Sequence, residues 1–277
     1  MTVKLGVVMD PIETINFHKD SSLAMLLAAQ ARGWELYYME QDDLFLRDSD
    51  CHAQMCRLEV RADPQDWFTR AEAETRPLAS LDVVLMRKDP PVDMEYLYTT
   101  FLLQRAEAAG VLVVNRPAAL RDASEKLYTA WFRDVCPPTL VSRRHAEFDA
   151  FIDAHRDVII KPLGGMGGMS IFRIRADDPN RNVILETLTG HQRQFAMAQR
   201  FIPEISAGDK RILVIDGDPI PYALARIPSA GENRGNLAAG ATGKGVELSD
   251  RFGEPPVVRE VIAEHHEDNE RLSPICF

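Results

Sequence analysis

The sequence lacks three features that would place it in a common protein class at once. It has four cysteines in 277 residues, none in a Cys-x-x-Cys pair, so neither a zinc site nor a disulfide framework is indicated. No apolar run reaches the ~18 residues of a membrane span. Positive charge is in deficit, because 42 acidic residues outnumber 32 basic ones and the net charge is -10. We therefore expect a soluble cytoplasmic protein that binds neither nucleic acid nor an anionic membrane.

The length and the hydrophobic content favour two domains. At roughly 150 residues per domain, a chain of 277 residues with 45% hydrophobic content can form two buried cores. In the first part, apolar strands at 3–9, 35–39, 81–86 and 111–114 alternate with helices at 21–32 and 95–109. This alternation predicts an α/β domain with an open, mostly parallel sheet. The polar stretch 51–77 has no clean period and is interpreted as a surface excursion.

A different pattern begins near residue 123. It predicts a helix at 125–135, a break at Pro137-Pro138 and an amphipathic stretch at 145–155. Strands follow at 158–161 and 170–174, then a helix at 182–188 and strands at 194–201 and 211–215. A hairpin turn at 216–219 leads into a last strand at 220–226. Mixed strands of this kind differ from the first part. We therefore place the domain boundary between residues 122 and 123, which gives domains 1–122 and 123–277.

The strongest motif is a lysine at the end of a strand, followed by a glycine-rich loop. Strand 158–161 ends on Lys161, and the loop that follows contains Gly164, Gly165, Met166, Gly167 and Gly168. Glycines allow backbone N–H groups to approach phosphate oxygens, because no Cβ intervenes. The residue order matches neither a P-loop nor a GxGxxG motif. A flexible turn with an exposed lysine is the alternative, but the lysine favours a nucleotide phosphate.

Two further segments fit a nucleotide site. Lys126 lies at the start of a predicted helix, where the helix dipole disfavours a cation unless an anion is near. A solvated surface charge is the alternative. Farther along, a strand ends at Pro203, so that Gln199, Arg200, Phe201 and Ile202 could present backbone groups to a planar base. Ordinary core packing is the alternative for these four residues.

Arginines and a glycine-containing segment follow. Arg211 and Arg226 are predicted near the ends of paired strands, where both guanidinium groups would face one cleft and bind carboxylate or phosphoryl oxygens. Surface salt bridges are the alternative. Residues 229–240 contain three glycines and no strand period, which predicts a lid that carries Arg234 and Asn236. A disordered linker is the alternative for this segment.

In the first domain, polar residues follow two predicted strands. Asp10 comes after the first strand, and Arg87, Lys88 and Asp89 come after the third. Ligands bind at the carboxyl ends of the strands in open α/β sheets. These residues therefore predict a ligand at the interdomain face, although Asp10 also suits an ordinary loop start.

Several strings, in order, resemble the prokaryotic glutathione synthetase family of the ATP-grasp superfamily. They are KLGVVMDPI, KDSSLAML, LMRKDPP, VVNRP with LRDASEKL, IIKPLGGMGG, GDKRILVIDG and RIPSAGENRGNLAAG, and they span roughly residues 2–240. The resemblance implies a substrate-binding domain at 1–122 and an ATP-grasp domain with α+β lobes at 123–277. It also implies ATP-dependent ligation of γ-L-glutamyl-L-cysteine to glycine through an acyl phosphate, with Mg²⁺ or Mn²⁺, in a homo-oligomer such as a tetramer.

The resemblance also assigns roles to residues. Lys126 and Lys161 would contact the ATP phosphates, the loop from Gly164 to Gly168 would cover them, the backbone from Gln199 to Ile202 would hold adenine, and Asp209 would lie near the ribose. Arg211 and Arg226 would be catalytic by stabilising the acyl phosphate, Arg87 would bind the peptide substrate, and residues 227–240, with Arg234 and Asn236, would close over the site. Cations suit this chemistry, because an acyl phosphate concentrates negative charge.

The C-terminal sequence departs from the family after Gly240. The Glu-x-Asn-type sequence that binds the metal in the family has no counterpart in residues 241–277, so the metal ligands stay unassigned. His265, His266, Glu267, Asp268 and Glu270 are interpreted as a solvated helix face. We therefore expect an incomplete, divergent or truncated ATP-grasp domain. This expectation leaves open a nucleotide-binding chain with impaired or no turnover, and another ATP-grasp ligase, such as a D-alanine ligase or a glutamate-adding enzyme.

Overall fold

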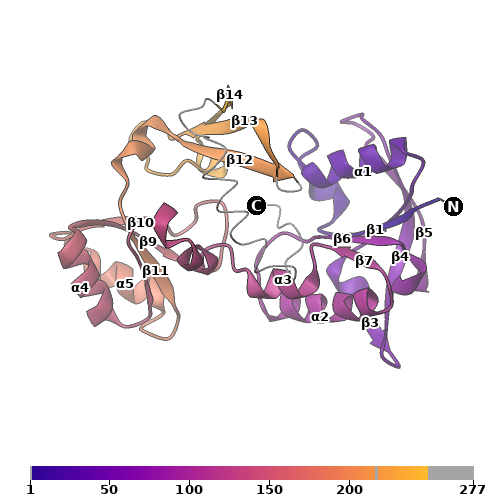
Figure 1. The fold of residues 1–277 in the computed structure, drawn as a ribbon, viewed down its shortest axis with the longest axis horizontal. Helices are drawn as coiled ribbons and strands as arrows, with labels where there is room; N and C mark the ends of the chain where they lie inside the picture. Colours follow the sequence, from indigo (N-terminus) through magenta and orange to yellow (C-terminus); the bar gives the residue numbers. More distant parts are fainter. Residues whose placement is uncertain (1, 216–217, 249–277) are drawn as a thin grey trace. The chain divides into compact units, whose positions relative to one another are not determined.

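The computed structural model describes residues 2–215 and 218–248. The chain divides into two compact units, Met1–Asp122 and Ala123–Phe277, and each is described by itself (Figure 1). No helix within the described ranges is long and apolar enough to cross a membrane.

The first unit contains a seven-stranded sheet with the order β3-β4-β2-β1-β6-β7, in which β5 also pairs with β4. Strands β1 (Lys4–Met9), β2 (Glu35–Met39), β6 (Val83–Arg87) and β7 (Leu112–Val114) pair in parallel. Strands β3 (Leu44–Arg47), β4 (Asp50–Val60) and β5 (Phe68–Pro77) add antiparallel pairs. The predicted parallel strands are thus confirmed, and an antiparallel part extends them.

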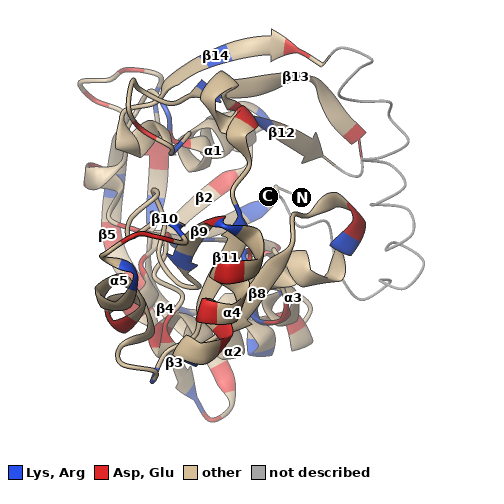
Figure 2. Cartoon of the chain, turned by 90° about the vertical axis from the view of Figure 1, so that its left-hand side faces the viewer, with Lys and Arg blue, Asp and Glu red and all other residues tan. Residues whose placement is uncertain are grey.

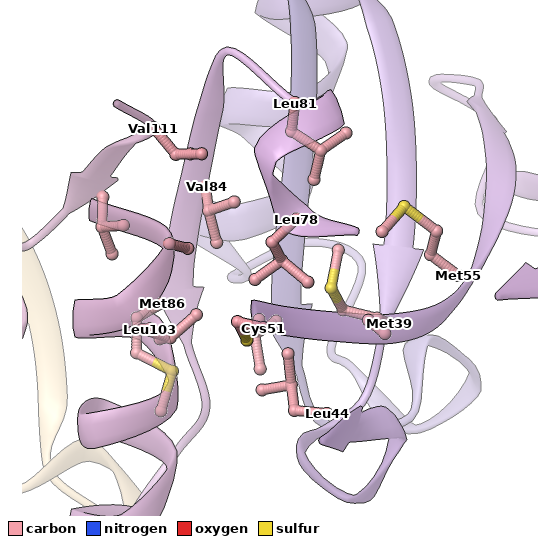
Figure 3. Packing of buried hydrophobic residues seen from close by; sticks show 14 of the residues in the cluster. Met39, Leu44, Cys51, Met55, Leu78, Leu81, Val84, Met86, Leu103 and Val111 are labelled. Atoms are coloured by element: carbon pink, nitrogen blue, oxygen red, sulfur yellow. The ribbon is translucent and has the colours of Figure 1, made fainter. Parts of the chain in front are cut away.

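Each face of this sheet supports its own apolar core. Leu5 and Val7 of β1 pack into one cluster with Leu23 of α1 (Ser21–Ala31). Val8 points the other way, into a second cluster with Leu103 of α2 (Met94–Ala108), and Figure 3 shows the packing of this second cluster. Side chains alternate between the two faces of a strand, so a sheet covered on both faces needs the continuous apolar strands seen in the sequence.

The prediction of a surface excursion at residues 51–77 is wrong. This stretch forms the β4–β5 pair, whose register shifts between Cys56 and Leu58. Before the shift, Cys51, Ala53 and Met55 enter one core cluster, whereas Cys56, Leu58 and Val60 enter the other. The apolar positions therefore change from odd to even numbers, and a search for one period of two misses the strand. Strand β5 is almost entirely exposed, which explains its polar composition.

The second unit contains a four-stranded antiparallel sheet with the order β10-β9-β11-β8. Its strands are β8 (Thr139–Ser142), β9 (Asp157–Pro162), β10 (Phe172–Arg175) and β11 (Ala196–Arg200). Helices α4 (His145–His155) and α5 (Arg181–Thr189) cover one face, where Phe148, Val158, Ile160 and Leu185 are buried in one cluster. Acidic residues mark the exposed side of α4 (Figure 2).

The helix predicted at residues 125–135 does not form. Two 3-10 helices, η4 (Leu127–Trp131) and η5 (Arg133–Val135), occupy this segment. Pro137 restricts the residue before it to an extended conformation, and Cys136 adopts φ -114° and ψ 147°. Lys126 consequently lies at the N-cap of a 3-10 helix and not at the start of an α-helix.

A three-stranded antiparallel sheet with the order β12-β13-β14 completes the described part of this unit. Strands β12 (Asp209–Ile215) and β13 (Asp218–Ile227) form the predicted hairpin, and β14 (Thr242–Glu247) was not predicted. Residues 216–217 of the hairpin turn, and residues 249–277 with the candidate metal ligands from His265 to Glu270, lie outside the described residues. The remaining short helices are α3 (Pro117–Asp122), η1 (Ile12–Thr14), η2 (Gln41–Asp43), η3 (Leu78–Ser80), η6 (Pro203–Ala207) and η7 (Leu237–Ala239).

Candidate functional site

Lys161 lies on the face of the four-stranded sheet that α4 and α5 leave uncovered. Its neighbours Val158 and Ile160 point into the helix-covered core, and strand alternation therefore turns Lys161 to the opposite face. The Nζ atom of Lys161 donates a hydrogen bond to Oε1 of Gln199 at 2.8 Å. Burial and the nearby charge of Lys126 lower the pKa of Lys161 below its ordinary value. A bound anion would therefore stabilise the protonated form of Lys161.

Lys126 reaches the glycine-rich loop from a distant part of the sequence. Its Nζ atom donates to the carbonyl oxygen of Gly165 and to Oε1 of Glu125, both at 2.8 Å. Gly165, Gly167 and Gly168 have φ values of +91°, +68° and +81°, a region that glycine adopts readily. The structure thus brings both lysines and the loop together, as a phosphate site requires.

The segment expected to hold adenine has fewer free backbone donors than the sequence suggests. The N–H groups of Arg200 and Phe201 donate to Pro138 O at 3.1 Å and to Asp157 O at 3.0 Å. Within the described residues, the N–H of Ile202 has no acceptor, and the side chain of Ile202 is exposed. A planar base would therefore meet the backbone at Ile202, whereas the side chain of Gln199 is already bonded to Lys161.

Asp209 and Arg226, which the sequence assigns to different ligands, bind each other. Nε and Nη2 of Arg226 donate to the two carboxylate oxygens of Asp209 at 2.7 and 2.6 Å. In the hairpin register Asp209 lies opposite Arg226, and Arg211 lies opposite Leu224. Both arginines therefore share one face, as predicted, but only Arg211 is exposed and without an ion pair among the described residues. Arg226 keeps only Nη1 for a further anion.

The predicted lid lies directly on the glycine-rich loop. Nη1 of Arg234 donates to Gly168 O at 3.1 Å, and Nη2 donates to Glu232 at 2.5 Å; this hydrogen bond from Arg234 lowers the pKa of Glu232 to about 2. A Cβ on Gly168 would lie 2.7 Å from Oδ1 of Asn236, and one on Gly235 would lie 2.7 Å from a carboxylate oxygen of Asp209. The contacts bring Arg234 and Asn236 to the phosphate loop, while lid motion stays a prediction.

The strand-end residues of the first unit also meet. Because β1 pairs with β6, Asp10 accepts bonds from Nζ of Lys88 and from the N–H of Asp89, both at 2.8 Å. Arg87 donates to the hydroxyl groups of Ser22 at 3.0 Å and Ser21 at 2.9 Å. No carboxylate in the described part of the chain pairs with Arg87, so its charge is available to an anionic ligand.

Two residues near Lys161 were missed from the sequence. Oγ1 of Thr139 accepts a hydrogen bond from Nε2 of Gln199 at 3.0 Å. Cys136 lies close enough to Lys161 that the lysine charge opposes the rise in thiol pKa that burial causes. Both residues lie near the start of β8, and only the pairing of β8 with β11 brings them to the site.

The described residues do not supply a metal centre. Among them, no three His, Cys, Asp or Glu side chains gather where a metal ion could bind. The candidates His265, His266, Glu267, Asp268 and Glu270 lie outside the described ranges, so the metal ligands stay unassigned.

Comparison with known proteins agrees with the two-unit arrangement. The family model "Prokaryotic glutathione synthetase, N-terminal domain" matches residues 3–121, and the model "Prokaryotic glutathione synthetase, ATP-grasp domain" matches residues 125–265. The chain is 56% identical to a glutathione synthetase of Pseudomonas syringae pv. tomato, over 100% of the chain and 91% of that protein. It is 59% identical to a glutathione synthetase of Pseudomonas aeruginosa, over 91% of the chain and 79% of that protein.

Solved structures agree on the fold. The structure of the D-cycloserine synthetase DcsG superposes with a TM-score of 0.63 at 13% identity, over 99% of this chain and 84% of that one. At this identity the likeness concerns the fold alone, and it confirms the predicted ATP-grasp architecture. The two lysines lie beside a glycine-rich loop, two family models match, and more than half of the aligned residues are identical to those of the curated relatives. The chain therefore belongs to the prokaryotic glutathione synthetase family and is an ATP-grasp enzyme.

Proposed function

We propose that the chain ligates γ-L-glutamyl-L-cysteine to glycine, with ATP as the energy source, and forms glutathione, ADP and phosphate. Glutathione synthetases that are 55–59% identical over at least 90% of the chain support this function. The single structural observation that carries the proposal is the convergence of Lys126, Lys161 and the glycine-rich loop. Two ammonium groups and a loop with four glycines suit a polyphosphate.

The proposed reaction explains why cations gather there. The cysteinyl carboxylate of γ-glutamylcysteine is a poor electrophile. Its oxygen therefore first attacks the γ-phosphorus of ATP, and ADP leaves. The glycine amine then attacks the carbonyl carbon of the acyl phosphate, loses a proton, and phosphate leaves. Negative charge accumulates on the transferred group, and fixed cations in a partly dehydrated site stabilise it.

Residue roles follow from this scheme. Lys126 and Lys161 hold the phosphates beneath the loop from Gly164 to Gly168, and the backbone near Ile202 meets the base, with Asp209 near the ribose. Arg211, whose guanidinium is exposed, is the better placed of the two proposed catalytic arginines, because Arg226 is bonded to Asp209. In the first unit, Arg87 binds a carboxylate of the peptide substrate. Arg234 and Asn236 close the phosphate loop against water.

Mg²⁺, with Mn²⁺ as a substitute, belongs to the proposal as the counter-ion of ATP. Among the described residues, no three possible ligands gather in one place, and no step is assigned to the ion. A cytoplasmic homo-oligomer such as a tetramer completes the proposal. Light scattering after size-exclusion chromatography tests the oligomeric state.

The direct test mixes the full chain with ATP, magnesium, γ-glutamylcysteine and glycine, and measures phosphate release and glutathione formation. We expect both products in equal amounts. Protection by ATP against thermal unfolding, without turnover, would favour a nucleotide-binding chain. Turnover with other amines or acids, but not with these two substrates, would favour another ATP-grasp ligase.

Lys161→Ala tests the phosphate site. Removing a partly buried cation should weaken ATP binding by roughly 10- to 100-fold, because hydrogen bonds to charged groups contribute about 1.5–3 kcal/mol. Isothermal titration with a non-hydrolysable ATP analogue measures the change. Lys244→Ala, which removes an exposed lysine from β14, is the matched control. Unchanged affinity in Lys161→Ala would refute the role given to this residue.

A further inference from the structure

A chain of three hydrogen bonds connects the Lys161 ammonium, through the side chains of Gln199 and Thr139, to the backbone at Pro137. Nζ of Lys161 donates to Oε1 of Gln199 at 2.8 Å, and Nε2 of Gln199 donates to Oγ1 of Thr139 at 3.0 Å. Oγ1 of Thr139 in turn donates to the carbonyl oxygen of Pro137 at 2.8 Å. All three side chains are partly buried, so each bond is less open to competition from water than one on the surface.

The direction of this line is determined by the chemistry of its members. A threonine hydroxyl has one proton, and here that proton goes to Pro137 O, which leaves Oγ1 to accept. Only the NH₂ side of the Gln199 amide can donate to that oxygen, so the carbonyl side must face Lys161. Lysine offers donors and no acceptor, and the amide oxygen suits it. Thr139 thus determines which end of Gln199 meets the lysine.

The sheet register makes this arrangement rigid. Gln199 of β11 pairs with Thr139 of β8, and Met197 of β11 pairs with Lys161 of β9. The opposite face of β9 and β11 packs on the core through Ile160 and Ala198, both fully buried. Three adjacent strands therefore present the three side chains on one face.

The group that accepts the hydrogen bond from Lys161 is the uncharged amide of Gln199, which leaves the charge of Lys161 unneutralised. The charged and titratable groups that act on Lys161 are Lys126, Glu125 and Cys136. Glu125 is bonded to Lys126, and the amide of Gln199 orients Nζ without cancelling its charge. A carboxylate at position 199 would orient Nζ equally well but would compete with a phosphate for it.

We propose that Thr139 and Gln199 are positioning residues that aim the Lys161 ammonium at a phosphate of ATP and keep its charge free for that phosphate. This proposal rests on the proposed function, because it takes ATP as the ligand of Lys161. It also gives the side chain of Gln199 a role at the phosphate end of the site, whereas the sequence analysis gave a role only to its backbone.

The first test removes the support one bond at a time. Gln199→Ala should raise the KM for ATP about tenfold, and Thr139→Val, which keeps the side-chain shape, should raise it roughly threefold. Thr139→Ser retains the hydroxyl and should restore the KM for ATP to the wild-type value. The KM values for γ-glutamylcysteine and glycine should stay unchanged. Thermal unfolding of each variant verifies that the fold is intact, and Gln199→Ala keeps the test decisive if Thr139→Val fails to fold.

The second test uses the charge. ATP binding should weaken as the pH rises through the pKa of Lys161, which burial lowers. Gln199→Glu should move this loss to higher pH, since a carboxylate favours the protonated lysine, and should raise the KM for ATP about tenfold at neutral pH. Gln199→Ala should move the loss to lower pH. The series is made in a Cys136→Ser background, so that thiol ionisation does not contribute, and Gln194→Glu adds the same charge at an exposed turn.

The proposal is supported if Gln199→Glu and Gln199→Ala shift the pH at which ATP binding is lost in opposite directions, and if only the KM for ATP changes. Shifts in the same direction, equal KM values for Thr139→Val and Thr139→Ser, or a parallel rise in the KM of every substrate would overturn it. Failure of the wild-type chain to bind ATP or to form glutathione would instead overturn the proposed function, so the two failures are distinguishable.

Discussion

The two sheets of the second unit are stabilised by different interactions. The four-stranded sheet packs on α4 and α5 through a cluster of nine buried residues. In the described part of the three-stranded sheet, only Ala223 is buried, and Ile215 and Tyr222 are 54% and 57% exposed. Within the described residues, the three-stranded sheet therefore relies more on its backbone hydrogen bonds and on the Arg226–Asp209 pair than on buried apolar side chains.

This difference divides the candidate site. Lys161 and Gln199 lie on the sheet with the apolar core, whereas Asp209, Arg211 and Arg226 lie on the sheet without one. Segments with few buried apolar contacts open at a lower free energy than core strands. We therefore expect Lys161, proposed to bind phosphate, to be held in position before ATP arrives, and the arginines proposed for the acyl phosphate to be more easily displaced.

The largest expected effect concerns the core itself. Phe148→Ala should lower the opening free energy of the β9 amides by about 3–5 kcal/mol, because the deleted ring is fully buried. Tyr222→Ala, also an aromatic truncation, should lower that of the β13 amides by less than about 1 kcal/mol, because the ring is exposed. Native-state hydrogen exchange measures both values. Equal losses at the two sites would break the comparison between the sheets.

An intermediate effect is expected where the predicted lid meets the three-stranded sheet. In Gly235→Ala, the new methyl group would lie 2.7 Å from the Asp209 carboxylate, so the lid segment must move away. We expect kcat/KM for glutathione formation to fall about tenfold, or about 1.4 kcal/mol, with little loss of stability. Steady-state kinetics and thermal unfolding measure the two quantities. Gly245→Ala on β14, where an added Cβ meets nothing within 4 Å, is the control; equal activity in both variants would contradict this prediction.

The smallest effect is expected from an ion pair on the four-stranded sheet. Hydrogen bonds from Arg173 lower the pKa of Asp157 below its ordinary value of 3.8. The pair therefore stabilises the fold above the unfolded-state pKa, and this contribution disappears as the pH falls through the lower, folded-state pKa. Because both side chains are about a third exposed, the contribution should stay below about 1 kcal/mol.

Asp157→Asn measures this contribution. The variant should lose that stability at neutral pH and show a flatter decline of stability as the pH falls below the ordinary carboxyl pKa of about 4. Urea unfolding at a series of pH values provides the measurement, and Asp177→Asn, at an exposed turn residue, is the control. A decline as steep as that of the wild type would remove Asp157 from the acid response of this sheet.

Much of the fold follows from local patterns, and the misses have local causes. Continuous apolar runs such as β1 and β9 and the periodic helices α2 and α4 were predicted within a few residues. Strand β4 was missed because its apolar positions change phase at a register shift. The 3-10 helices η4 and η5 were missed because the segment is rich in helix formers, which predicted an α-helix, whereas Pro137 forces the residue before it into an extended conformation.

The site shows the same division. Lys161 and the glycine-rich loop were proposed for phosphate binding from their residue types and spacing, and Lys126 from the family resemblance. The bond between Asp209 and Arg226, the bond of the Gln199 amide to Lys161, and the bond between Gln199 and Thr139 were not predicted. Each of these depends on which strand lies beside which, and hairpin or crossover pairing is a long-range property.

By itself, the sequence determined the family and the two-part pattern of the chain, and it predicted which residue types would bind a polyphosphate, because these depend on composition and on spacing within short segments. The tertiary structure alone decided which of those side chains are still free. Residues 38 positions apart in the chain, such as Lys161 and Gln199, form a hydrogen bond with each other only after neighbouring strands pair. Strand pairing likewise bonds Arg226 to Asp209 and leaves Arg211 exposed.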